Sequence, residues 1–503
     1  MSTVPATIPR SSTHASRLSP WQWAMAIALL LALFFQLTRG ALRNSVTFDE
    51  GQHIARGYAY LKTGDLRFQR FQSAHPPGMA ILEAAPLLLI PDIPQLSALR
   101  GWDEHDTVLF AKQLVLKSPI IEKLMFAARV PVMLVMLLLA AFVFRWASEL
   151  RGIGPVAGLI AMGLCAFDPN IIAHGMLATT DLGVAAFSFI SLYWLSKSLS
   201  RPSPGRLALT GVTLGLALMS KMTALLLLPV STLVILALGM TARRANYFDG
   251  LQFIERWLAR VRNLSLRRLL GLAVMGATIY VVAFLVIWSS YRFEVGRLPG
   301  VPIPIPAATH FSSAVKAQQH MDVGHPAFLM GQLSEKGWWY YFPVAFLVKT
   351  PIPILILLAV SVALVIRTQT TDNRQRWLAF LPLATFVAAY GIVALVSSVN
   401  IGYRHLLPIL PCLFVLAGQF SIFKFQANHA LRITHYVSRF SFYSCGTSSA
   451  RSVCFPTISP ISTNSSAGQR MATSILWIPI SIGANRLSNC VRTLPKIIRA
   501  VSS

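Results

Sequence analysis

The chain has 503 residues, of which 54% are hydrophobic and only 12% charged, and its mean hydropathy is +0.58. A soluble domain usually carries about twice that charged fraction, so this composition excludes an ordinary soluble protein. It predicts an all-α, polytopic integral membrane protein. The net charge of +26 could suggest nucleic-acid binding, but most basic residues stand in short loops between apolar runs, as the positive-inside rule expects. We therefore expect no nucleic-acid partner.

The apolar runs predict about ten transmembrane helices. The first covers roughly residues 21–37, and Arg10 and Arg17 before it place a cytoplasmic N-terminal segment at 1–20. That first run lacks a small-residue cleavage site, so no cleavable signal is expected. The later helices are expected near 126–146, 154–168, 182–197, 206–220, 223–241, 269–289, 342–366, 377–397 and 403–419.

Alternation of the basic loops assigns four segments to the outer side of the membrane. These segments, which with short helices would form the outer loop region, are 39–123, 168–181, 290–341 and 397–405. Nearly all residues with useful side-chain chemistry fall in them or, like Lys221, at a further junction on the same side. The inner loops are little more than basic connectors.

The stretch TFDEGQHIARGYAYLKTGDL places two acids, Asp49 and Glu50, about ten residues after the first apolar run. Carboxylates at a membrane face are costly, so the pair indicates chemistry; two solvated loop acids are the alternative. His53 and Lys62 follow in the same stretch and are candidate substrate-binding residues, as is Tyr403 later in the chain. His75 lies in AHPPG, where two prolines fix a rigid turn, and it could either donate to a substrate or be purely structural.

Other candidate residues each have two readings. Asp181 begins a predicted helix and could bind substrate, or could simply favour the helix N-terminus. Lys221 and Arg404 could hold a phosphate, or could snorkel to the interface. Tyr403 adjoins Arg404 in NIGYRH, and the aromatic run 338–341 is typical of an interfacial belt, with a sugar platform as the alternative.

These motifs, with FDPNIIAHGMLATTDLG, GLALMSKMTALLLLP and GWWYYFPVAFLVKTPIP, occur in an order that resembles the bacterial polyprenyl-phosphate-sugar glycosyltransferases. That superfamily of C-type glycosyltransferases includes protein O-mannosyltransferases and the aminoarabinose transferase. The resemblance covers roughly residues 21–419 and implies Asp49 as general base, with Glu50 orienting the acceptor or the sugar. It also implies Asp181 as a second acidic site residue. The same base follows from chemistry, because an attacking hydroxyl needs its proton removed while cations hold the departing phosphate.

No cofactor is required by this interpretation. The His, Cys and acidic residues show no metal-ligand spacing, although a divalent cation held by Asp49 and Glu50 stays open. No Gly-rich phosphate loop is present, so a nucleotide sugar is not expected as donor. Five cysteines suggest neither a disulfide framework nor a metal site.

The sequence thus predicts a multi-pass enzyme of the bacterial inner membrane with a periplasmic active site. It would transfer a sugar from a polyprenyl-phosphate donor to a hydroxyl of a protein, lipid or glycan. A secondary transporter is the rival from another class, but the acids cluster at one face and no internal repeat is evident. An inactive remnant is the third possibility.

The third possibility comes from the tail, 420–503, which is basic, rich in serine and free of Asp and Glu. If the gene is read from the third base of each codon, the shifted codon across Met471 and Ala472 can encode only glycine. The shifted codon across Trp477 and Ile478 can encode only aspartate. That shifted stretch can read GYKHLVDSNLDWGQ, and 456–465 can read NDFAYFNEL, both similar to the downstream segment of the same enzymes. We therefore expect a frameshift between about 418 and 443 and a poorly ordered tail.

Overall fold

A computed structural model describes residues 18–150, 154–241, 263–367 and 374–427. The description confirms the expected all-α, polytopic class, since the only strands in these ranges are two short hairpins. A helix continues from Leu410 to Ala427, across the expected start of the tail at 420, and the tail itself stays a prediction. The rest of that tail and the first 17 residues lie outside the described ranges.

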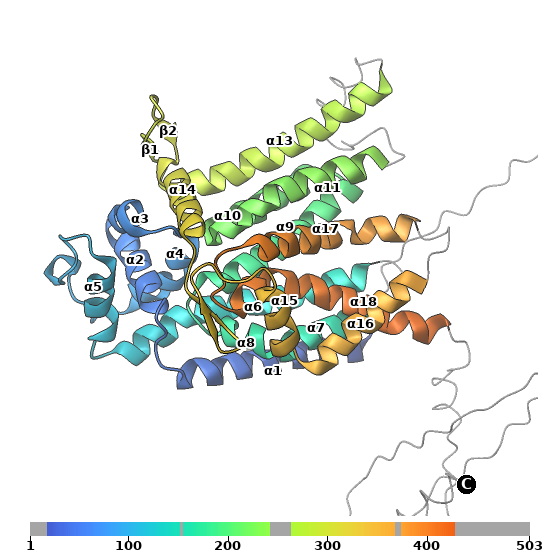
Figure 1. Cartoon of the computed structure of the whole chain (residues 1–503), viewed down its shortest axis with the longest axis horizontal. Helices are drawn as coiled ribbons and strands as arrows, with labels where there is room; N and C mark the ends of the chain where they lie inside the picture. The colour runs from blue at the N-terminus through green and yellow to red at the C-terminus, as the bar shows by residue number, and fades with distance from the viewer. Residues whose placement is uncertain (1–17, 151–153, 242–262, 368–373, 428–503) are drawn as a thin grey trace, which may run out of the picture. The chain divides into compact units, whose positions relative to one another are not determined.

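The apolar helices run alongside one another as a bundle (Figure 1). Within the described ranges, six are individually long and apolar enough to cross a membrane, or up to eight if each bent pair counts as one span, so the expected ten stays a prediction. The bundle helices are α1 (Pro20–Arg43), α6 (Ile121–Glu149), α7 (Pro155–Phe167), α9 (Thr180–Ser200), α10 (Pro204–Ser220), α11 (Leu227–Thr241), α13 (Leu264–Ser290), α16 (Ile352–Arg367), α17 (Arg374–Val396) and α18 (Leu410–Ala427).

Local sequence explains where these helices begin and break. At the start of α1, Ser19 and Gln22 form a capping box and Pro20 takes the first helical position. The single span expected at 342–366 is bent: α15 (Tyr341–Lys349) ends before Pro351 and meets α16 at 114°, so the pair forms either a broken span or a re-entrant loop. Proline restricts the residue before it to extended conformations, and Thr350 adopts one.

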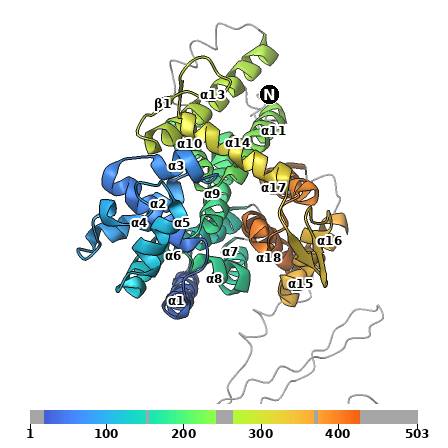
Figure 2. The ribbon, with the colours of Figure 1, turned by 60° about the vertical axis from the view of Figure 1, so that its left-hand side comes forward.

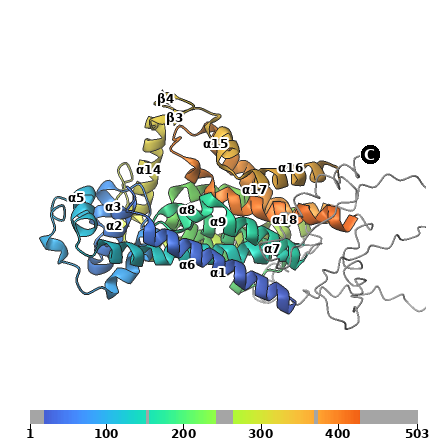
Figure 3. The same ribbon diagram turned by 90° about the horizontal axis from the view of Figure 1, so that it is seen from below.

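The expected first outer segment folds at one end of the bundle, which we call the α2 end (Figure 3). Its core is separate from that of the bundle and includes stacked Phe68 and Phe110 with Trp102 at their edges. Its elements are α2 (Glu50–Thr63), α3 (Arg67–Gln72), α4 (Gly78–Ala84), η1 (Ala85–Leu89), η2 (Leu96–Ala98), α5 (Thr107–Ala111) and the π-helix η3 (Lys112–Leu116).

The segment between α13 and α15 also contributes to the α2 end. The β1–β2 hairpin (Val295–Gly296 and Ile305–Pro306) leads into α14 (Ala308–Val323), whose first turn is capped by the Glu294 carboxylate. Figure 2 shows α14 passing from α3 toward α17. The hairpin of β3 (Ala327–Leu329) and β4 (Gln332–Ser334) follows.

Three short helices complete the described elements. The 3₁₀ helix η4 (Met222–Leu226) separates α10 from α11, and η6 (Tyr403–Ile409) precedes α18. Between α7 and α9, α8 (Pro169–Gly175) bends by 65° from α7. All three short helices lie at helix breaks, and the breaks at η4 and η6 place Lys221 and Arg404 in the site described below.

Candidate active site

Four charged side chains form a continuous chain of ion pairs at the α2 end. Arg404 Nη1 lies 2.7 Å from Asp49 Oδ2 and 4.0 Å from Asp181 Oδ2, and Lys221 Nζ lies 2.6 Å from Asp181 Oδ1. The residues come from four segments far apart in sequence, all expected on the same side of the membrane. The fold therefore brings together the principal acid and the two cations that the sequence singled out.

The backbone at each position explains why these side chains meet. Asp49 occupies the N-cap of α2 but makes no capping hydrogen bond, so its carboxylate is free to face Arg404. Asp181 lies in the first turn of α9. Lys221 has an extended backbone conformation at the junction between α10 and η4. Arg404 follows Gly402, whose φ of 136° is open only to glycine at low cost.

Burial differs along this chain of ion pairs. The side chain of Asp49 is 38% exposed, whereas that of Asp181 is only 4% exposed. A carboxylate that is to accept a proton from an incoming substrate must be reachable, and Asp49 is. Asp181 is enclosed between Lys221 and Arg404, which suits it to holding the two cations in place rather than to meeting the acceptor.

Histidines surround the ion pairs and are neutral at physiological pH. Burial lowers the pKa of His75 to about 3 and that of His405 to about 3, and the Lys221 ammonium adds to both effects. Burial and the Arg56 guanidinium likewise hold the pKa of His53 well below its usual range. These rings can donate or accept hydrogen bonds, but they add no positive charge.

Arg56 fixes the proton position of His53. Its Nη2 lies 3.0 Å from His53 Nδ1, and its Nη1 donates to Ser73 Oγ at 2.6 Å. A guanidinium has no acceptor, so His53 Nδ1 must accept and the ring proton must reside on Nε2. Ser73 in turn binds the backbone N–H of His75, whose ring lies 5.5 Å from that of His53. The two histidines are thus a single, preorganised unit.

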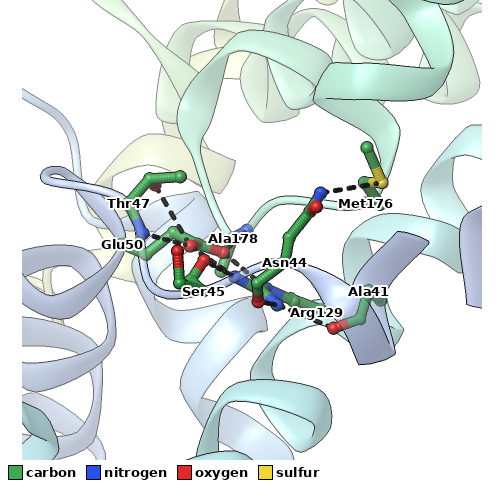
Figure 4. Close-up of polar contacts among 8 residues, drawn as sticks. All are labelled: Ala41, Asn44, Ser45, Thr47, Glu50, Arg129, Met176 and Ala178. Atoms are coloured by element: carbon green, nitrogen blue, oxygen red, sulfur yellow. Dashed lines mark hydrogen bonds and ion pairs between the residues drawn. The ribbon is translucent and has the colours of Figure 1, made fainter. Parts of the chain in front are cut away.

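Glu50 has a different environment from its neighbour Asp49 (Figure 4). Its carboxylate is fully buried in a two-point ion pair with Arg129, with both oxygens 2.8 Å from the guanidinium nitrogens. It also accepts from the backbone N–H groups of Thr47 and Ala178. Burial alone would raise the pKa of Glu50, but these hydrogen bonds outweigh it and hold the pKa below its usual value.

Arg129 connects this pair to the end of α1. Its guanidinium donates to the backbone carbonyls of Ala41, Asn44 and Ser45 while it holds Glu50 (Figure 4). One buried cation thereby fixes the exit of α1, the start of α2 and the approach to α9. The expected direct part of Glu50 in the chemistry stays a prediction.

A further buried acid, Glu83 of α4, was not singled out from the sequence. Neither of its carboxylate oxygens has a hydrogen-bond partner among the described residues. Burial, reinforced by the nearby Glu50 charge, raises the pKa of Glu83 well above its usual value. The buried environment of Glu83 therefore favours its protonated form.

Two of the expected site residues lie away from the ion pairs. Lys62 is exposed in the last turn of α2, with its ammonium 5.8 Å from the centre of the Tyr58 ring. Tyr403 is buried, and its hydroxyl lies 2.8 Å from Thr350 Oγ1. The structure brings neither side chain to Asp49, so their substrate-binding roles stay predictions. Tyr403 instead ties the Arg404 turn to the break between α15 and α16.

Sequence reasoning missed Arg129 and Glu83 although the same signal marks both. Arg129 interrupts the apolar run LMFAARVPVML, and a charge within a predicted span is itself a signal for a buried partner. Glu83 is likewise the single charged residue in the apolar stretch PPGMAILEAAPLLLIP. Among the described residues, no group of three or more His, Cys, Asp or Glu side chains is placed to hold a metal ion.

The fold and this cluster define a polytopic helical membrane protein with a charged site at one end of its bundle. Residues 110–249 match the family model for dolichyl-phosphate-mannose-protein mannosyltransferases. This match confirms the resemblance to the polyprenyl-phosphate-sugar glycosyltransferases that the motifs predicted. The matched stretch contains Arg129, Asp181 and Lys221.

Two crystal structures of ArnT from Cupriavidus metallidurans are similar to the chain. The structure bound to undecaprenyl phosphate has 16% identity and a TM-score of 0.46, and the apo structure 17% and 0.44. Each comparison covers 79% of this chain and 59% of the ArnT chain, so the protein spans less than two thirds of the ArnT length. No curated protein matches the chain.

Proposed function

We propose that this protein is a membrane glycosyltransferase that moves a sugar from a polyprenyl-phosphate donor to an acceptor hydroxyl at the α2 end. The observation that carries the proposal is the chain of ion pairs from Asp49 through Arg404 and Asp181 to Lys221. It combines a reachable base with two cations at the ends of apolar helices. The family-model match to dolichyl-phosphate-mannose-dependent enzymes supports the same class of donor.

The proposed reaction assigns one step to each group. The acceptor oxygen attacks the anomeric carbon of the sugar, the bond from that carbon to the phosphate oxygen breaks, and polyprenyl phosphate leaves. Asp49 accepts the hydroxyl proton as the new bond forms. Arg404 and Lys221 stabilise the negative charge that develops on the leaving phosphate.

The Asp49–Arg404 contact gives this scheme an internal switch. While no donor is bound, the guanidinium holds the carboxylate at 2.7 Å. A phosphate that binds Arg404 competes for the same guanidinium and frees the carboxylate to accept a proton. His53 and His75, as neutral rings, add hydrogen bonds to the sugar or phosphate without trapping the product by charge.

The rival expectation, a secondary transporter, would place its ionisable residues near the middle of the bundle. Here they meet at the ends of α9, α10 and the turn before α18. The acceptor class and the identity of the sugar are left open in this proposal. The site is expected at the periplasmic face.

The proposal is tested with the full chain reconstituted in liposomes and a panel of polyprenyl-phosphate sugars, following release of polyprenyl phosphate. Asp49→Asn keeps the size of the side chain but cannot accept the proton, so turnover should fall by about a hundredfold or more. Asp103→Asn, an exposed acid of the same segment, is the matched control and should be unaffected. Normal turnover by Asp49→Asn would contradict the proposal.

The same assay separates an active enzyme from an inactive remnant. It should compare the chain as given with one whose residues after 419 are re-read in the shifted frame. Activity only in the re-read chain would assign the tail an essential part of the site. Activity in neither chain, with both folded and every donor tried, would contradict the proposed reaction.

A further inference from the structure

The β3–β4 hairpin has one face against the protein and one apolar face turned away from it. In the register Phe328 pairs with Leu333, and these side chains are 62% and 80% exposed. The side chains of Ala327 and Leu329, on the other face of β3, lie against the protein. Ala327 is 3% exposed, and Leu329 packs against the bundle core. Soluble surfaces rarely present such a contiguous apolar patch without a partner.

The turn of this hairpin adds a third apolar side chain at a conformational cost. Met330 has φ 48° and Gly331 φ 86°, the backbone typical of a type I′ hairpin turn. Asn, Asp or Gly normally fill the first position because a side chain such as methionine is strained there. Yet Met330 is 82% exposed and touches little that could compensate the strain. Contacts with an environment outside the chain would compensate the strain.

The attachment of the hairpin places it beside the membrane-spanning surface. At its base His325 pairs with Val399, and Ser398 Oγ donates to the carbonyl oxygen of Met321. After β4, the chain passes the exposed Trp339 and enters α15, which lies at 114° to the apolar α16. Figure 3 shows the hairpin next to α15 and apart from α2 and α5.

We propose that this hairpin inserts Phe328, Met330 and Leu333 into the bilayer leaflet at the α2 end. Lipid is favoured over a protein partner because the hairpin lies next to α15, which leads into α16. That apolar helix, with Ile352, Ile356 and Val362 exposed, is part of a bent candidate membrane span. No charged residue lies between 326 and 334. The open strand edges need hydrogen bonds, so the backbone stays at the headgroup boundary and only the side chains reach the acyl chains.

The insertion fixes the depth of the site in the membrane. The hairpin is tied to residues 398–400, and Arg404 follows in the same turn. A hairpin anchored at the headgroup boundary therefore holds the guanidinium at the level where a lipid phosphate lies. This last step alone rests on the proposed function, whereas the insertion itself does not.

The test places a fluorescent NBD label on Met330→Cys in a cysteine-free full chain reconstituted in phosphatidylcholine liposomes. We expect blue-shifted emission and quenching by lipids carrying a doxyl group, with the 5-position quenching more than the 12-position. A label on Asp103→Cys, in a polar exposed loop, should show neither effect. Leu333→Cys carries the same test if the turn variant does not fold.

Two results would overturn the insertion. One is a label at 330 that aqueous iodide reaches as readily as the label at 103, without doxyl quenching. The other is blue-shifted emission without doxyl quenching, which would place the tip against protein, such as a second copy of the chain. Both readouts are independent of sugar transfer, so a failed proposed function leaves this test intact.

Discussion

Arg404 reaches across 355 residues of sequence to place its Nη1 atom 2.7 Å from Asp49 Oδ2. Both side chains are partly exposed, so this ion pair contributes little to the free energy of unfolding. In the proposed reaction this ion pair aligns the base and a phosphate-binding cation at the same point. The predictions below follow from this arrangement and from the buried pairs that support it.

Arg404→Met should lower turnover by about a hundredfold or more while leaving the chain folded, because one stabilising cation of the transition state is lost. Arg404→Lys should lower turnover less than Arg404→Met, because lysine keeps the positive charge but lacks the planar guanidinium. Turnover and thermal unfolding of the reconstituted chain measure the two effects. Normal turnover with Arg404→Met would reduce Arg404 to an interfacial residue.

Lys221→Met should lower both turnover and stability, because it leaves the Asp181 carboxylate buried beside one distant cation. Removing one partner of a buried ion pair costs about 3–5 kcal/mol of unfolding free energy. The double variant Asp181→Asn, Lys221→Met should regain most of the stability but none of the activity. Recovery of activity together with stability would show that this pair serves the fold alone.

Glu50→Gln should destabilise the chain more than it slows chemistry, since it leaves the Arg129 guanidinium buried without a counter-charge. We expect a loss of about 3–5 kcal/mol, partly restored by adding Arg129→Met. The pKa of Glu50 is lowered in the folded state, so its stabilisation is present above about pH 4.5 and is lost as the pH falls through the folded value. Unfolding followed from pH 7 to 3 checks this.

A Glu50→Gln chain of normal stability and greatly reduced turnover would give the opposite assignment. It would return Glu50 to the direct catalytic part that the sequence predicted. The matched comparison is Glu122→Gln, which changes an acid near the start of the same α6 helix that carries Arg129.

Glu83→Gln should stabilise the chain increasingly as the pH rises from 5 to 8. The pKa of Glu83 is raised, so above about pH 4.5 the unfolded chain has lost its proton while the folded chain still holds one. Stability then falls with rising pH in the wild type, and an amide removes this dependence. The difference in Tm between variant and wild type should widen with pH; a constant difference would show that Glu83 titrates normally.

Sidedness is tested by single cysteines at Asp103 and at Gly205, both exposed. The space around Gly205 is open, so a side chain fits there without displacing neighbours. In a cysteine-free background, an impermeant thiol reagent added to intact spheroplasts should label position 103 and spare position 205. The reverse pattern would invert the topology and move the site to the cytoplasmic face.

Much of this site could be predicted from the sequence because its residues break an otherwise apolar pattern. Asp181, Lys221 and Arg404 stand at the outer ends of predicted spans and Asp49 about ten residues after one, so alternation of the basic loops puts all four on the same side. The sequence could not show that the two adjacent acids have different partners and different burial. Asp49 and Glu50 look alike in a one-dimensional pattern.

The difference between the two acids depends on contacts over long sequence separations. Glu50 turns toward Arg129, which lies 79 residues away, while Asp49 turns toward Arg404. The break at Thr350 and Pro351 escaped for a similar reason, because hydropathy averaged over a window does not see a bend. Lys62 was included for its place in a motif, whereas three helical turns separate it from Asp49.

The Asp49–Arg404 contact also sets an order of events during synthesis. Asp49 leaves the ribosome 355 residues before Arg404. At roughly 5–20 residues per second, about 20 to 70 seconds pass between the two. In the proposed reaction, Asp49 then has no cation opposite it and a donor phosphate lacks Arg404 throughout that interval. We therefore expect a partly translated chain in the membrane to be inert toward a polyprenyl-phosphate donor until the segment before α18 has been inserted.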